Sequence, residues 1–175
     1  MRVKRTLGGF FEKLMGAYKE TEESVPMTPI QKDIDQKIYI GDPDASGWCR
    51  WASIEQPDNR DFENLLNELE IENVHEDVIE YFTSYYFFGI DAKFQLHGIA
   101  LTSIVPGDNF KRLRMMLDDP NPEYIPIGVE YSQNYRVSIE IKTGIVTFED
   151  DETGKRRKIT SSIEEFINGL EPPIQ

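Results

Sequence analysis

Large apolar side chains recur every three or four residues in five parts of the chain, which is the period of an amphipathic helix. The clearest case is 59–70, where Phe62, Leu65, Leu66 and Leu69 form one stripe after an Asp-Asn cap. A second helix starts at His75-Glu76, with acids in its first turn, and is expected to run to Gly89. The remaining helices are expected over 7–20, from Asp108 to Asp118-Asp119-Pro120, and over 163–170 after two overlapping capping boxes.

A period of two, typical of strands, appears in two other regions. Residues 94–96 and 99–104 alternate around an expected turn at His97-Gly98. In the C-terminal part, strands over 137–141, 145–148 and 155–160 form a meander in which basic side chains face the acids at 149–152. Residues 21–36 contain two prolines and are expected to be irregular. Helices packed against a largely antiparallel sheet make an α+β fold.

Size and composition favour one folded domain over residues 1–175, with 1–36 as an N-terminal helix and connection. Apolar residues make up 39% of the chain and aromatic residues 11%, too much for a disordered acidic protein. The single cysteine, Cys49, excludes an internal disulfide and a multi-cysteine zinc site. No apolar run is long enough to span a membrane, and the N-terminus is too charged for a signal peptide. These features predict a cytoplasmic protein.

Charge is concentrated in the middle of the chain. The net charge is −13, and residues 55–91 hold eleven acids but only one basic residue, Arg60. A folded segment this negative attracts cationic partners and repels phosphate. A basic protein surface is therefore the expected partner, and nucleic acid is not expected. The helix over 7–20 is basic instead, so it either lies on an anionic membrane surface or packs on its own acidic domain.

Catalytic groups do not form a recognisable set. His75 lies among carboxylates, His97 is expected at a hairpin tip, and Cys49 is expected to be a small buried apolar residue. The acids at 149–152 lack the ligand spacing of a calcium loop, and no phosphate-binding glycine loop occurs. We therefore expect no enzymatic activity, no cofactor and no metal. The alternative from another class is a hydrolase that uses two of the many carboxylates.

A partner-binding surface is predicted around one acidic concavity. Glu76 and Glu80 are four residues apart and so share one side of a helix, where we expect both to be exposed. Six aromatic residues crowd 81–88, and at least two are expected to line a groove as anchors for basic side chains. The alternative is an ordinary solvated helix face. The predicted residues are Glu76, Glu80, Asp91, Tyr81, Tyr85, Trp48 and Trp51.

An ordered series of segments resembles the Syd family of SecY-interacting proteins. The series covers about residues 51–172, whereas 1–36 match weakly and 115–120 depart from the family's pattern. Its segments are Trp51 with Gln56-Pro57, Leu69-Glu70-Ile71-Glu72, His75 to Tyr86, Leu101-Thr102, Gly107 to Leu113, Thr143 to Val146, and Ile163 to Pro172.

The resemblance implies a compact α+β domain of the SUKH superfamily with an electronegative concave face. It implies docking on the basic cytosolic loops of the SecY translocon, which the protein would modulate or monitor. Contact with the inner membrane would then be peripheral and only through that partner. The alternative within the superfamily is an immunity protein that neutralises a toxin domain, often a nuclease. Charge fits both roles.

Overall fold

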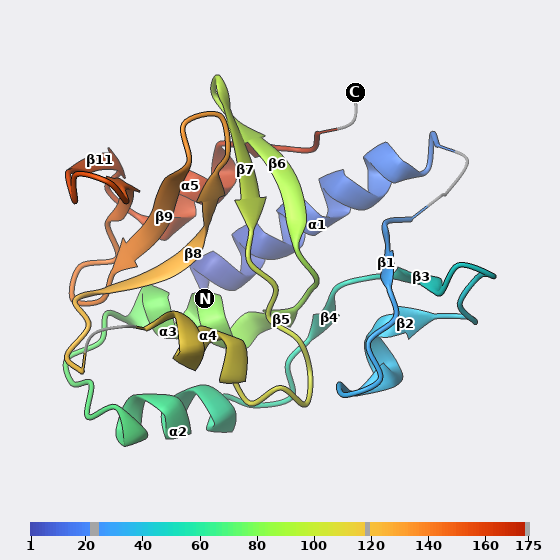
Figure 1. Ribbon diagram of the computed structural model, residues 1–175, viewed down its shortest axis with the longest axis horizontal. Helices are drawn as coiled ribbons and strands as arrows, with labels where there is room; N and C mark the ends of the chain where they lie inside the picture. The colour runs from blue at the N-terminus through green and yellow to red at the C-terminus, as the bar shows by residue number, and fades with distance from the viewer. Residues whose placement is uncertain (22–24, 118–119, 174–175) are drawn as a thin grey trace.

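The computed structural model describes residues 1–21, 25–117 and 120–173. A curled antiparallel sheet of seven strands forms its centre, in the order β11-β10-β9-β8-β7-β6-β12. Helices α1 and α5 lie behind this sheet in Figure 1, and α2, α3 and α4 lie below it. The strands are β6 (Ile90–Phe94), β7 (His97–Leu101), β8 (Tyr124–Glu130), β9 (Tyr135–Glu140), β10 (Val146–Asp150), β11 (Arg156–Thr160) and β12 (Leu170–Glu171). The α+β class and the antiparallel sheet are as predicted.

The helices follow the predicted apolar stripes with shifted ends. In chain order they are α1 (Arg2–Tyr18), α2 (Arg60–Glu68), α3 (Glu76–Ser84), α4 (Lys111–Met116) and α5 (Ile163–Asn168), with a short 3-10 helix at Gln36–Ile38. Of the two predicted capping boxes, the one built on Ser162 and Glu165 caps α5, whereas the Glu164 carboxylate pairs with Arg2 instead of Ser161. The Ser162 hydroxyl accepts from the Glu165 N–H at 3.1 Å, and the Glu165 carboxylate accepts from the Ser161 N–H at 3.0 Å.

Helix α1 is part of the core. It starts at Arg2 rather than near residue 7, and it buries Val3, Leu7, Phe10, Phe11 and Leu14 against α3, α5 and β12. These side chains are at most 4% exposed. The prediction that this basic helix packs on its own domain is confirmed, because the face that would enter a membrane is covered.

Two small sheets are separate from the main one. Strands β1 (Met27–Pro29), β3 (Trp48–Trp51) and β2 (Tyr39–Ile40) pair in the order β1-β3-β2, and Trp51 packs edge-on against Phe88. Strand β4 (Ile54–Glu55) pairs with β5 (Tyr85–Tyr86). The expectation of an irregular 21–36 is therefore wrong at β1; within that range, 22–24 lie outside the described residues.

Two other boundaries differ from the prediction, and a third falls partly outside the described residues. Helix α3 ends at Ser84, not at Gly89, because the next two residues pair with β4. The β6–β7 turn lies at Gln95-Leu96, and His97 pairs with Phe94. The predicted helix stop at 118–119 lies outside the described residues, and α4 ends at Met116.

The C-terminal meander is confirmed, including the predicted charge pairing across its second hairpin. Glu149 of β10 lies opposite Arg156 of β11, and their side chains form an ion pair at 3.0 Å. Phe94 of β6 packs on Phe166 of α5, which joins the sheet to the helical layer. Within the described residues, no helix is long and apolar enough to cross a membrane.

Candidate protein-binding surface

Three segments that are distant in sequence enclose an acidic hollow of about 420 Å³. They are the α2–α3 connection at 70–73, the approach to β8 at 121–123, and the β9–β10 turn at 140–142. Two backbone hydrogen bonds hold them together. The His75 N–H donates to the Ile141 carbonyl at 2.8 Å, and the Ile141 N–H donates to the Glu123 carbonyl at 2.9 Å. The hollow is therefore fixed by backbone, and its side chains only line it.

Local conformation explains why the α2–α3 connection presents its acids. Glu70 and Asn73 both have left-handed backbone, with φ of 54° and 56°, so the chain turns sharply at each end of Ile71-Glu72. Ile71 is half-buried against the core while Glu70 and Glu72 are exposed. The apolar residue anchors the turn and leaves the two carboxylates at the rim.

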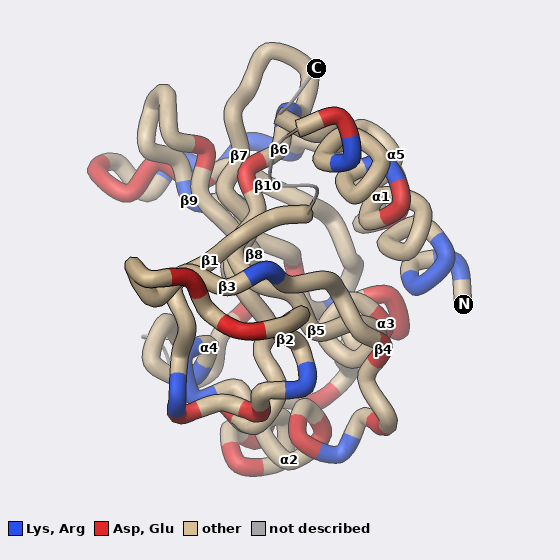
Figure 2. The backbone as a smooth tube through the Cα atoms, turned by 90° about the vertical axis from the view of Figure 1, so that its right-hand side faces the viewer, with Lys and Arg blue, Asp and Glu red and all other residues tan. Residues whose placement is uncertain are grey.

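The electrostatics of the acidic hollow are one-sided. Its lining carries one basic side chain, Lys142, and an apolar floor that includes Ile71 and Ile141. Figure 2 also shows acidic positions along α2 and at the start of α3. A lysine or arginine entering here could lay its methylene stem on the floor and keep its charge among carboxylates. Those carboxylates are Glu70, Glu72, Glu123 and Glu140.

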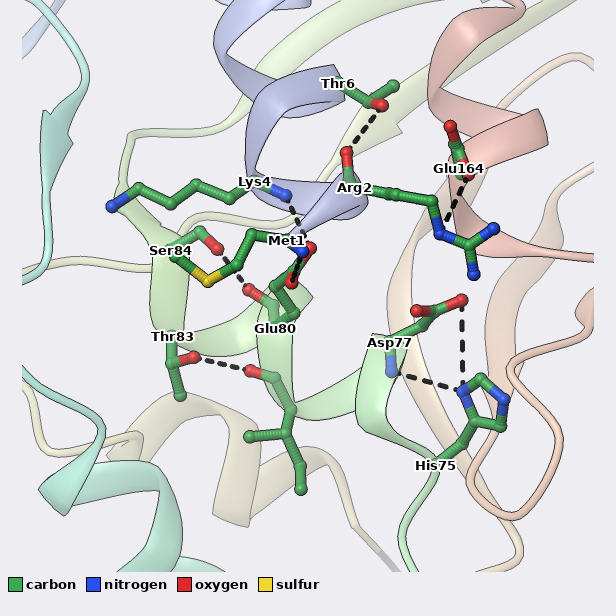
Figure 3. A network of polar contacts seen from close by, with 11 residues as sticks. Met1, Arg2, Lys4, Thr6, His75, Asp77, Glu80, Thr83, Ser84 and Glu164 are labelled. Carbon is green, nitrogen blue, oxygen red and sulfur yellow. Dashed lines mark hydrogen bonds and ion pairs between the residues drawn. The ribbon is translucent and has the colours of Figure 1, made fainter.

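None of the seven residues predicted from the sequence lines this hollow, and Glu76 is the one that follows its α2–α3 segment most closely along the chain. It is exposed and follows His75, whose backbone closes the hollow. The His75 ring caps α3, because its Nδ1 accepts from the Asp77 N–H at 3.1 Å (Figure 3). His75 therefore serves both features: its ring caps α3, and its backbone N–H bonds to Ile141 beside the acidic hollow.

Glu80 has a different role. Its carboxylate Oε2 accepts from the Lys4 N–H at 2.7 Å, and its Oε1 lies 3.6 Å from the amino group of Met1 (Figure 3). The side chain is 19% exposed. The expectation that Glu76 and Glu80 are both exposed is therefore wrong for Glu80, because α1 lies on it and uses it as an N-terminal cap.

Other acids of the 55–91 segment also bind basic groups of the same chain. Glu55 pairs with the Lys4 amine at 2.8 Å, and Glu68 pairs with Arg114 at 2.6 Å. At the far side of α1, Arg2 lies 3.7 Å from Glu164. Part of the negative charge predicted to face a partner is thus used to hold α1 and α4.

The predicted aromatic residues are mostly core. Five of the six in 81–88 are buried. Tyr81, Phe82 and Tyr86 do line a cavity, but its volume is only about 20 Å³, so they are not exposed anchors of a groove. Tyr81 is 1% exposed, burial raises its pKa, and its hydroxyl has no hydrogen-bond partner within the described part of the chain. Tyr85 is half-buried at the edge of the Phe11 ring, and burial, then the charge of Glu55, raises its pKa.

The two tryptophans lie on opposite faces of β3. Trp51 is 2% exposed and Trp48 is 45% exposed. Trp51 and Asp91 do line a common hollow of about 160 Å³ beside the C-terminal end of α1. The structure thus brings together two of the predicted residues there, but that hollow is separate from the acidic hollow near Glu76.

Two acids of the acidic hollow were not singled out from the sequence. Glu123 and Glu140 lie outside the 55–91 run, each next to a turn, and only the pairing of β8 with β9 brings them together. The one sequence signal was the Thr143-Gly144 turn, which places Glu140 at the end of its strand. Gly144 has φ of +75° and lies against the His75 ring.

The potential catalytic and metal-binding groups are dispersed. Cys49 is buried, with Sγ 3.6 Å from the Gly41 carbonyl oxygen. His97 lies in β7 rather than at a hairpin tip, and packs against Phe148 and the buried Glu130. Among residues 1–21, 25–117 and 120–173, no group of three histidine, cysteine or acidic side chains is arranged to hold a metal ion.

A match to a family model confirms the family named from the sequence but not the expected extent, because it covers the N-terminal part that was expected to match weakly and does not reach the segments at 143–146 and 163–172. The model of the family described as Syd protein (SUKH-2) matches residues 4–118, which is more than half of the chain. The match includes α1 and the N-terminal connection, and it ends before β8, so Glu123 and Glu140 lie beyond it. No curated protein sequence matches the chain. The chain belongs to the Syd protein (SUKH-2) family.

Proposed function

We propose that this protein is a non-enzymatic binding module that docks its acidic hollow on a basic protein surface. The observation that carries the proposal is the hollow itself, where four carboxylates surround an apolar floor and one lysine opposes them. Buried floor and charged rim together suit an extended basic loop better than a free metal ion or a nucleic acid. The partner we propose from family membership is the cytosolic loops of the SecY translocon.

In this role the protein would modulate or monitor the translocon. It would be cytoplasmic and would reach the inner membrane only through that partner. Contact with the membrane only through the partner is supported by α1, because the apolar face of this helix is buried in the protein and not available to lipid. Residues Glu70, Glu72 and Glu76 are the exposed acids that we expect to face the partner.

Binding to purified translocon in lipid nanodiscs tests the proposal. The variant Glu70→Lys/Glu72→Lys reverses two exposed charges at the hollow. The matched control is Asp42→Lys/Glu152→Lys, which changes the net charge equally at two exposed positions elsewhere. We expect binding by the wild type and the control, and loss of binding by the hollow variant.

Equal binding by both variants would contradict the assignment of the hollow. No binding to translocon by the wild type would contradict the SecY role. In that case, specific recovery of a toxin domain that the protein inhibits would assign it to the immunity branch of the superfamily instead.

A further inference from the structure

The outer edge of β11 is an unpaired strand edge. β11 (Arg156–Thr160) is the last strand of the seven-stranded sheet and lies at the left margin of Figure 1. It pairs with β10 on its inner side, and no other strand of the described residues pairs with its outer side. Such an edge offers main-chain groups to an incoming strand.

The hairpin geometry identifies which backbone groups point outward. The Asp150 N–H donates to the Lys155 carbonyl at 2.9 Å, so Lys155 directs its backbone toward β10. Because pairing alternates along an antiparallel ladder, Arg157 does the same, and the N–H and C=O of Arg156 and Lys158 point outward. No described side chain or loop bonds to these four groups.

The same strand holds the densest positive charge in a chain of net charge −13. Residues 155–158 read Lys-Arg-Arg-Lys, and all four are exposed. The Arg156 guanidinium is already occupied, since it lies 3.4 Å from the centre of the Tyr124 ring and pairs with Glu149. Among the described residues, Lys155 and Lys158 have no ion pair, so their charges remain for a ligand.

These two observations select one kind of occupant. A second copy pairing through its own β11 would set four cations against four cations, which is unfavourable for directly opposed residues. An apolar strand is also disfavoured, because pairing with it would place the lysine charges of the edge strand against apolar side chains. An acidic strand meets neither obstacle, because it satisfies both the outward backbone groups and the free amines. We propose that β11 accepts an acidic extended segment of a partner protein as an eighth strand of the sheet.

This surface is independent of the acidic hollow and of the proposed translocon role. The hollow lies at the β9–β10 turn and the α2–α3 connection, whereas β11 forms the opposite side of the second hairpin. The two surfaces also have opposite charge. A partner that used both would therefore need a basic loop and a separate acidic strand.

A labelled nine-residue peptide of alternating glutamate and valine, blocked at both ends, is the probe. Its control has the same sequence and charge but carries N-methyl groups on alternate backbone amides, which removes donors without changing charge. We expect the parent peptide to bind full-length protein at low salt, and the methylated peptide to bind at least tenfold more weakly. Amide exchange at Arg156 and Lys158 should slow only with the parent. Equal binding by both peptides, or no binding at millimolar peptide, would overturn the proposal.

Two substitutions at Lys158 separate backbone from charge. Lys158→Ala removes the amine alone, while Lys158→Pro also removes an outward N–H that β10 does not use, a position where an edge strand tolerates proline. We expect the proline variant to bind about fivefold more weakly than the alanine variant. Lys93→Ala, at an exposed lysine of β6, should bind as the wild type does. Equal affinity of the two Lys158 variants would count against strand addition, and the methylated peptide decides the case if the proline variant does not fold.

Discussion

Glu80 on α3 caps helix α1 through Lys4, a residue 76 positions away in sequence. The carboxylate accepts the Lys4 backbone N–H at 2.7 Å, one of the donors that the first turn of a helix leaves unsatisfied. Met1, the N-cap residue of α1, does not supply this cap, since its side chain makes no capping hydrogen bond. A carboxylate that is distant in sequence therefore caps α1, whereas the adjacent Ser162 hydroxyl caps α5.

Loss of this cap should destabilise the fold. We expect Glu80→Ala to lower the free energy of unfolding by about 1–2 kcal/mol, the upper range for a lost N-terminal cap. Glu76→Ala, one turn earlier on the same helix but exposed, should change it by less than about 0.5 kcal/mol. Urea denaturation of the two variants measures the difference. Equal effects would mean that the Glu80 contact contributes nothing in solution.

Glu76 and Glu80 also show what cannot be predicted from the sequence. Glu76 and Glu80 are four residues apart and look equivalent on a helical projection, and only the position of α1 separates them. Local sequence patterns predicted the structure correctly where an element depends mainly on its own residues, as with the apolar stripe of α2 and the Ser162 cap of α5. They failed where a distant element decides, as at Tyr85-Tyr86, which leave α3 to pair with β4.

Strand β8 is the largest element that the pattern did not predict. Pro126 and Gly128 interrupt its alternation, and such residues ordinarily mark turns. Here the register shifts between them, and a Cβ on Gly128 would lie 2.5 Å from the Ala100 carbonyl oxygen. The glycine is thus required by a neighbouring strand. Because Glu123 lies just before β8, missing this strand also hid half of the acidic hollow.

That close approach predicts a strong effect of the smallest possible substitution. Gly128→Ala places a methyl group against backbone that cannot rotate away, so the two strands must separate. We expect a loss of about 1–3 kcal/mol, the usual cost of overpacking a core. Gly9→Ala, where a Cβ would meet no atom within 4 Å, should instead be neutral or slightly stabilising in its helix. Thermal unfolding of the two variants compares them, and similar melting temperatures would contradict the account.

Glu130 makes stability depend on pH. Burial alone would raise the pKa of this fully buried carboxyl, but hydrogen bonds from the Ser132 hydroxyl and the N–H groups of Gln133 and Ser132, with the charge of His97, lower it overall. Because the pKa is lower in the folded state, the ionised carboxylate stabilises the fold at pH values above its ordinary pKa of 4.5. This stabilisation is lost as the pH falls through the pKa of the folded state.

We therefore expect the free energy of unfolding to decrease from pH 5 toward pH 3 more steeply in the wild type than in Glu130→Gln. At pH 7 the variant should be less stable by about 1–3 kcal/mol, because the β8–β9 turn loses charge-assisted hydrogen bonds. Denaturation at a series of pH values checks both statements. Parallel curves for the two proteins would show that Glu130 does not titrate differently in the folded and unfolded states.

Tyr81 offers the opposite case, a buried polar group without a partner. Its hydroxyl is unpaired within the described residues, and the cavity that the side chain lines has a volume of about 20 Å³, enough for one water molecule. If the cavity is dry, Tyr81→Phe removes an unsatisfied group, and we expect stability to rise by about 1 kcal/mol. Urea denaturation gives the sign. A loss of stability would mean that a bound water satisfies the hydroxyl.

Charge at the acidic hollow should control how fast a basic partner is found. Raising ionic strength from 0.1 M to 1 M shortens the screening length from about 10 Å to about 3 Å, so long-range attraction disappears while short contacts persist. We expect the association rate to fall more than the dissociation rate rises.

Glu70→Lys/Glu72→Lys should reproduce the high-salt association rate at low salt and keep the wild-type fold, since both side chains are exposed and form no ion pair among the described residues. Glu76→Lys/Glu80→Lys would confound the measurement, because Glu80 also caps α1. Stopped-flow or surface-plasmon kinetics with the partner decides the matter: association that is indifferent to salt and to the Glu70/Glu72 reversal would mean an apolar interface, and exposed Trp48 on β3 would then become the first residue to substitute.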